Sequence, residues 1–181
     1  MALKPTVYKF KISLSDLNRS HFDAVGLTVA KHPSENDERM MARLLAYCIN
    51  AQDGLDFGAG LSDVDEPAIS LTTLDDQRVL WIDVGEPSVE RLKKATRKGR
   101  QTKVYSFNSK SDVWWQQGES QFRQFNADFY RFNWEEIQTF AALLERTMDF
   151  SVTLSGNSAY IATAKGECEV HWATLQENHS R

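Results

Sequence analysis

The chain has 181 residues, 41% of them hydrophobic, which predicts one domain with its own buried core. It carries 25 Asp and Glu against 21 Lys and Arg, a formal net charge of −4. This balance excludes a protein that coats nucleic acid through overall positive charge, so nucleic acid would have to meet a local basic patch.

The N-terminal part shows strand and helix patterns and no targeting segment. Residues 1–5 contain no apolar leader, and no run approaches the ~18 apolar residues of a membrane span, so we expect a cytoplasmic protein that does not enter a membrane. Residues 6–14 alternate as a half-buried strand, with a partner strand at 25–30. Ser34 is a good N-cap for a helix expected from Glu35 to about Asn50.

The middle of the chain predicts a hairpin followed by a parallel crossover. A glycine-rich loop covers 52–62, and two strands at 68–73 and 79–84 flank a turn at 75–77. Ser88 caps a second helix that ends near Lys98, before Gly99. Because a strand pattern follows at 102–107, strand, helix and strand suggest a crossover unit.

The C-terminal part continues with alternating elements. The conformation of 112–117 stays open, and its Trp114–Trp115 pair is typical of a half-buried position, with a base-stacking platform or interface as the alternative. Asn133 and Glu136 form a capping box. The expected elements are a strand, a helix, a hairpin and a further strand, at 127–132, 134–146, 149–164 and 167–172. We therefore expect a single domain over 1–173 and a polar tail over 174–181.

Two cysteines, Cys48 and Cys168, stand far apart without CxxC spacing, which argues against a structural zinc site. Apolar or strand-like surroundings predict two reduced thiols. The chain also lacks the P-loop, G-x-G-x-x-G and G-x-S-x-G signatures of nucleotide-binding proteins and serine hydrolases.

Carboxylates gather near the predicted hairpin. Asp63, Asp65 and Glu66 precede its first strand, and Asp83 lies in the otherwise apolar second strand. A lone acid in a buried strand needs compensation, and a hairpin could bring these acids to one sheet edge, where oxygen ligands suit Mg²⁺ or Mn²⁺. The alternative is that they are solvated residues of a loop and a strand end. Glu38, on the flank of the first helix, could pair with arginine, extend the cap or reach the metal.

The helix after Asp83 is basic. Its buried stripe is expected to contain Val89, Leu92 and Thr96, with Arg91 and Lys93 on the flanks and Lys94 nearly opposite the core. One interpretation is a solvated basic face. The other is a phosphate-contacting patch beside the acids, formed by Arg91, Lys93, Arg97 and Lys98.

Several motifs in this chain together resemble the YaeQ family of bacterial proteins over nearly the whole length and in order. The matching segments are Ala2-Leu3-Lys4, Ala30-Lys31-His32-Pro33-Ser34-Glu35, Asp37-Glu38-Arg39-Met40-Met41, Gly60-Leu61-Ser62, Asp65-Glu66-Pro67, Leu80-Trp81-Ile82-Asp83-Val84-Gly85 and Val113-Trp114-Trp115-Gln116-Gln117. The resemblance implies an α/β (α+β) fold: a mixed sheet flanked by helices, a variant of the PD-(D/E)XK restriction-endonuclease-like core with extra hairpins.

The resemblance also implies site residues. In that superfamily an acid ends one strand, a D/E-x-K follows on the next, and a helix Glu helps to bind metal. Here the first acid would be Asp65 or Glu66, the second Asp83 and the helix acid Glu38. Gly85 stands where the catalytic lysine belongs, so Lys93 or Lys94 would supply the charge, and the helix projection favours Lys93.

Two functional hypotheses follow. The first is a Mg²⁺- or Mn²⁺-dependent phosphodiesterase acting on DNA or RNA, with Asp65, Glu66, Asp83 and Lys93 or Lys94 as catalytic residues. The second is a non-catalytic member of the fold that binds nucleic acid or a protein partner, which Gly85 and the acidic pI of about 5.6 favour.

Overall fold

A single curled sheet organises the chain, which a computed structural model describes over residues 4–58 and 65–178. The strands are β1 (Thr6–Asp16), β2 (His21–Lys31), β3 (Leu55–Phe57), β4 (Ile69–Thr72), β5 (Arg78–Val84), β6 (Gln101–Ser106), β7 (Ala127–Phe132), β8 (Thr147–Ser155), β9 (Ser158–Thr163) and β10 (Gly166–Gln176). The helices are α1 (Asp37–Asn50), α2 (Val89–Lys98), α3 (Ser111–Phe122) and α4 (Trp134–Ala141).

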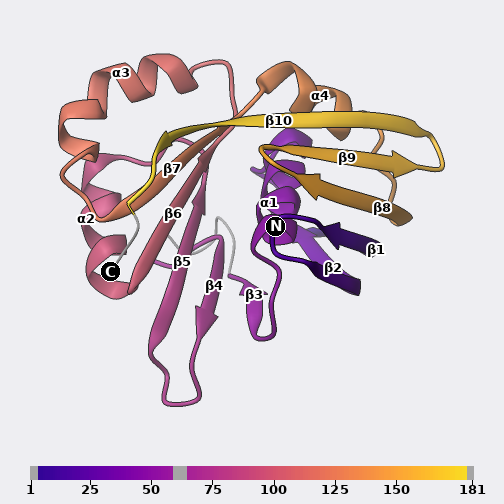
Figure 1. The fold of residues 1–181 in the computed structure, drawn as a ribbon, viewed down its shortest axis with the longest axis horizontal. Helices are drawn as coiled ribbons and strands as arrows, with labels where there is room; N and C mark the ends of the chain where they lie inside the picture. Colours follow the sequence, from indigo (N-terminus) through magenta and orange to yellow (C-terminus); the bar gives the residue numbers. More distant parts are fainter. Residues whose placement is uncertain (1–3, 59–64, 179–181) are drawn as a thin grey trace.

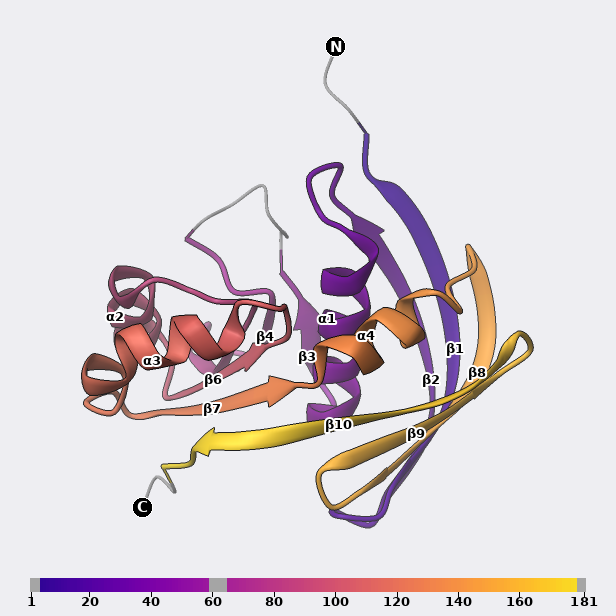
Figure 2. The ribbon, with the colours of Figure 1, turned by 90° about the horizontal axis from the view of Figure 1, so that it is seen from above.

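The sheet runs in the order β2-β1-β8-β9-β10-β7-β6-β5-β4-β3 and curls around α1 until it nearly closes (Figures 1 and 2). Strands β5, β6 and β7 are parallel, with α2 and α3 as their crossovers, which confirms the predicted strand–helix–strand unit. Strand β8 pairs antiparallel with β9 and parallel with β1, so N-terminal and C-terminal strands belong to one sheet.

Two apolar layers cover the two faces of the parallel strands. The main core lies inside the curl, where α1 and α4 pack on alternate residues of the strands, such as Phe10, Ile82 and Phe132. A second cluster lies on the opposite face, where α2 and α3 cover Val104 and Phe129. Strand β5 therefore has both faces buried, which is why an acid on it needs a partner.

Several predicted elements are confirmed, including the alternation of β1, the β4–β5 hairpin, the Ser88 cap and the β8–β9 hairpin. The segment left open, 112–117, lies in the helix α3. Both cysteines are free thiols, as expected. No helix formed by the described residues is long and apolar enough to cross a membrane.

Several boundaries differ from the predictions, beginning with β2, which spans His21–Lys31 where 25–30 was expected. The N-cap of α1 is Asn36, not Ser34, because the Asn36 side chain accepts the Arg39 N–H at 2.8 Å. Helix α4 ends at Ala141, five residues before the expected Arg146. The predicted loop 52–62 contains the short strand β3, and its part from residue 59 lies outside the described residues. Strand β10 extends into the predicted tail, where Thr174 pairs with Tyr130 of β7.

Candidate functional site

The α2-facing side of β5 carries an aromatic and an acidic residue in place of an apolar stripe. Leu80, Ile82 and Val84 point into the main core, so the alternation of the strand turns Trp81 and Asp83 towards α2. Both are almost fully buried, at 1% and 3% exposure. The Trp81 indole Nε1–H donates to Asp83 Oδ1 at 3.0 Å.

Arg91 compensates the buried carboxylate of Asp83. The Ser88 hydroxyl caps α2 by accepting the Arg91 N–H at 3.2 Å, which places Arg91 in the first turn beside the end of β5. The Arg91 guanidinium donates from Nε to Asp83 Oδ2 at 2.8 Å and from Nη2 to Asp83 Oδ1 at 3.0 Å. Such a two-point pair is among the stronger ion pairs in proteins, and it engages both carboxylate oxygens.

The segment before β4 joins this network through Glu66. Its backbone carbonyl accepts a hydrogen bond from Arg91 Nη2 at 2.8 Å, and its carboxylate accepts one from Arg78 Nη2 at 2.8 Å. The guanidinium carbons of Arg78 and Arg91 lie 5.2 and 5.9 Å from the Trp81 ring centroid, within the range of cation–π attraction. Trp81 and Asp83 thus anchor two arginines on this face of the sheet.

Three of the four predicted metal ligands are engaged with a cation of the protein. Asp83 holds Arg91, Glu66 holds Arg78, and Asp65 lies 3.5 Å from Lys94 Nζ. Among residues 4–58 and 65–178 no three or more His, Cys, Asp or Glu side chains form a group that could hold a metal ion.

Glu38, in the first turn of α1, therefore does not complete such a group with the acids near β5, and Asp63 lies outside the described residues. In this arrangement the side chains do not fit a bound divalent cation. A Mg²⁺ or Mn²⁺ ion at Asp83 stays a prediction, and it requires Arg91 to leave the carboxylate.

The exposed side of α2 is basic. Leu92 and Ala95 are buried, whereas Lys93, Lys94, Arg97 and Lys98 are exposed. We call these four side chains, together with the exposed Arg100 that follows the helix, the α2 basic face. Lys93 and Arg97, and Lys94 and Lys98, stand four residues apart, where like charges destabilise a helix by a few tenths of a kcal/mol per pair.

The helix projection was wrong about which residues of α2 approach the acids. Lys94, expected to point away from the core, reaches Asp65, while Lys93 makes no ion pair within the described ranges. Arg91, expected to contact nucleic acid, is committed to Asp83. Of the predicted nucleic-acid contacts, Lys93, Arg97 and Lys98 are exposed on the α2 basic face.

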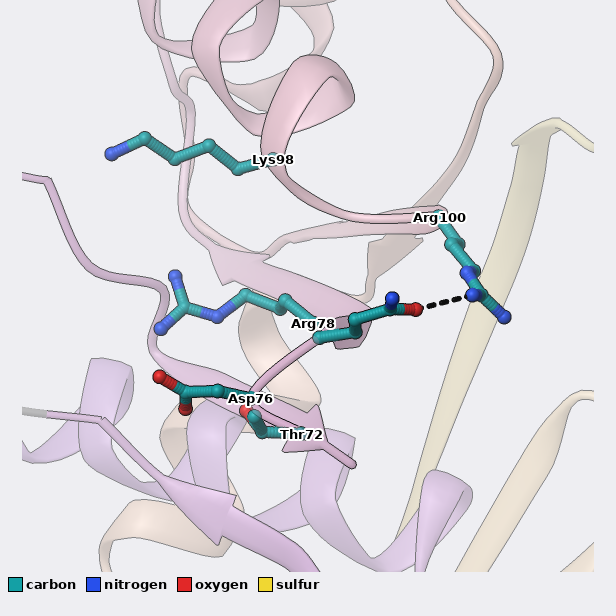
Figure 3. Close-up of a pocket in the computed structure, with 6 residues that line it drawn as sticks. Thr72, Asp76, Arg78, Lys98 and Arg100 are labelled. Carbon is teal, nitrogen blue, oxygen red and sulfur yellow. Dashed lines mark hydrogen bonds between the residues drawn. The ribbon is translucent and has the colours of Figure 1, made fainter. Parts of the chain in front are cut away.

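A pocket of about 470 Å³ lies where the end of α2 meets the β4–β5 hairpin, and we call it the hairpin pocket (Figure 3). It is lined by Thr72, Asp76, Gln77, Arg78, Lys98 and Arg100. Lys98 and Arg78 extend in the same direction in Figure 3, whereas Arg100 turns to the other side, where it donates a hydrogen bond to Gln77 Oε1. The buried Nε of Arg78 has no hydrogen-bond partner among the described residues.

Sequence reasoning missed Arg78 and Trp81 as parts of this site. Arg78 lies one residue before the strand expected at 79–84, and its role depends on where Glu66 lies in three dimensions. Arg100 carried a usable signal, since it extends the run of positive charge that begins at Arg91.

Comparisons with known proteins place this arrangement in a family. The family model described as YaeQ protein matches residues 1–172. A protein of Escherichia coli (strain K12) named "Uncharacterized protein YaeQ" is 36% identical over 179 residues, covering 98% of this chain and 99% of that protein. The protein of the same name from Salmonella typhi is 35% identical, with the same coverage.

Two crystal structures have closely similar folds. The YaeQ protein from Xanthomonas axonopodis pv. citri gives a TM-score of 0.92 at 30% identity, covering 95% of this chain and 98% of that one. The YaeQ protein from Pseudomonas syringae gives a TM-score of 0.91 at 34% identity, covering 96% and 97%.

Proposed function

This chain belongs to the YaeQ family, and we propose that it binds the phosphate backbone of nucleic acid through the α2 basic face, without a divalent cation at Asp83. The observation that carries the proposal is the pairing of Asp83 with Arg91 beside an exposed row of lysines and arginines. The PD-(D/E)XK core is part of the proposal: Asp83 stands at the end of β5 as the motif acid, and Gly85 replaces the motif lysine.

The local charge supports a polyanionic partner. Residues 91–103 hold seven Lys and Arg and no Asp or Glu, within a chain whose net charge is −4. Contacts from lysine and arginine to phosphates supply most of the affinity in sequence-independent binding. An anion lying along α2 would also relieve the repulsion between the like charges four residues apart.

The test is binding of labelled single- and double-stranded oligonucleotides by fluorescence anisotropy over a series of salt concentrations. The variant replaces Lys93, Arg97, Lys98 and Arg100 with Gln. Its control replaces four exposed lysines on other surfaces with Gln and so carries the same net charge: Lys9, Lys11, Lys110 and Lys165.

Each lost phosphate contact lowers the slope of log K against log salt by about 0.9 for duplex DNA, so four contacts give about 3.6. We expect a loss of about that slope in the α2 variant and a near-parental slope in the control. Equal behaviour of the two variants would refute the proposal, and absence of nucleic-acid binding by the parent would favour the protein-partner alternative.

A second candidate is the Mg²⁺-dependent phosphodiesterase that the family resemblance suggests. The observation in its favour is that Asp65 and Glu66 lie near the Asp83 end of β5, with Lys94 Nζ 3.5 Å from Asp65. Its test is a cleavage assay with Mg²⁺ or Mn²⁺ on DNA and RNA, in which Asp83→Asn must abolish activity. Activity that survives in Asp83→Asn would indicate a contaminating nuclease.

A further inference from the structure

Resting on the proposed function, we infer that the hairpin pocket is a phosphate-monoester site that receives the phosphorylated end of a nucleic-acid strand. The pocket shares Lys98 and Arg100 with the α2 basic face, so a strand anchored there continues along α2 towards Lys94. The pocket thereby adds a preference for strand ends to a surface that otherwise binds any backbone.

Cationic side chains from different elements line this pocket, with Arg78 and Lys98 extending in the same direction and Arg100 turned to Gln77 (Figure 3). Arg78 comes from the start of β5, Lys98 from the last turn of α2 and Arg100 from the loop before β6. Arg78 gives one Nη to Glu66 but keeps a buried Nε–H without a partner among the described residues.

The charge of the pocket matches a group with more than one negative charge. Its lining has three cationic side chains and one acid, Asp76, while Glu66 partly offsets Arg78 from outside the lining. A phosphate monoester carries about −1.5 to −2 at pH 7 and three acceptor oxygens, whereas an internal phosphodiester carries −1. The volume of about 470 Å³ leaves room for the attached sugar.

Asp76 gives the inference a sharp test, because it is the acid in the lining and opposes any anion there. It occupies the hairpin turn with φ 65°, a left-handed conformation that Asn tolerates as well as Asp. Asp76→Asn therefore removes the charge without straining the turn. We expect this variant to bind a phosphorylated end about three- to tenfold more tightly than the parent does.

The experiment compares oligonucleotides of one sequence with a 5′-phosphate, a 3′-phosphate or hydroxyl ends, and uses inorganic phosphate as a competitor. The parent is expected to prefer one phosphorylated end about fivefold to tenfold. Lys98→Gln is expected to abolish that preference. Lys93→Gln, on the same helix but outside the pocket, is expected to weaken all the oligonucleotides equally.

Each outcome separates the inference from the proposed function. Equal binding of phosphorylated and hydroxyl ends, with the salt slope intact, overturns the pocket and leaves the binding surface. Loss of preference in Lys93→Gln as much as in Lys98→Gln also overturns the pocket. Binding of inorganic phosphate that Lys98→Gln weakens, without oligonucleotide binding, overturns the proposed function and supports a site for a small phosphate monoester.

Discussion

Because Asp83 pairs with Arg91, we expect Arg91→Met to lower the free energy of unfolding more than Asp83→Asn does. In Arg91→Met the carboxylate, whose side chain is 4% exposed, keeps the Trp81 indole but loses its counter-charge. A buried charge left without its partner typically costs about 3–5 kcal/mol. In Asp83→Asn the amide oxygen can still accept the indole N–H, and the 28% exposed guanidinium keeps Glu66 O and can reach water, so we expect about 1–2 kcal/mol.

The double variant Arg91→Met/Asp83→Asn separates this explanation from simple loss of packing. Because it removes both charges, it should be more stable than Arg91→Met alone, with a coupling of about 2 kcal/mol. Urea unfolding followed by tryptophan fluorescence measures the free energy of unfolding of all three variants. A cost of Arg91→Met below about 1 kcal/mol, or additive effects in the double variant, would refute the reasoning.

Three further predictions concern the rest of the molecule. Burial lowers the pKa of Lys103, so between that pKa and its ordinary value of 10.5 the unfolded chain holds a proton that the folded chain has lost. In this pH window the free energy of unfolding of the parent should therefore rise with pH relative to that of Lys103→Gln. Urea midpoints of the two proteins, measured across the window, give this difference. Burial raises the pKa of the Cys48 thiol to about 12, so Ellman's reagent at pH 8 should leave Cys48 unmodified until urea is added. Because Cys168 is only half-buried, the result that would contradict this is rapid reaction of two thiols per folded chain. In Gly118→Ala the new Cβ would lie 2.3 Å from two carbons of the Phe122 ring, so calorimetry should show a lower Tm, whereas the control Gly26→Ala, with no atom within 4 Å, should not.

Local signals in the sequence predict those elements whose ends are set by neighbouring residues. The period of two in β1 and the Ser88 and Gly99 boundaries of α2 are confirmed because alternation and capping act within a few residues. The parallel pairing of β1 with β8 joins residues about 138 positions apart, as in Lys9 with Thr147, and no short pattern encodes it. The Ser34 prediction was wrong because a second capping side chain, Asn36, stands two residues later.

The sequence indicated which charged residues belong to the candidate site, but not which of them form ion pairs with one another. The sequence showed that Asp83 needs compensation, and compensation is what the structure contains. The predicted partner was a metal ion, whereas the structure places a guanidinium there. Which residue of α2 reaches Asp83 depends on how the helix is rotated over β5, because Arg91 and Lys94, three residues apart, differ by only about 60° around the helix axis. Arg78 was missed because its ion-pair partner, Glu66, lies in the segment before the hairpin.

If Arg91 takes the place of a divalent cation at Asp83, nucleic-acid binding does not depend on metal. Anisotropy titration of one labelled oligonucleotide in EDTA, and again in Mg²⁺ or Mn²⁺ at matched ionic strength, tests this most directly when the recovered strand is sized on a denaturing gel. We expect equal Kd values and an intact strand in every condition. Binding or cleavage that appears only with the metal, and disappears in Asp83→Asn, would contradict it.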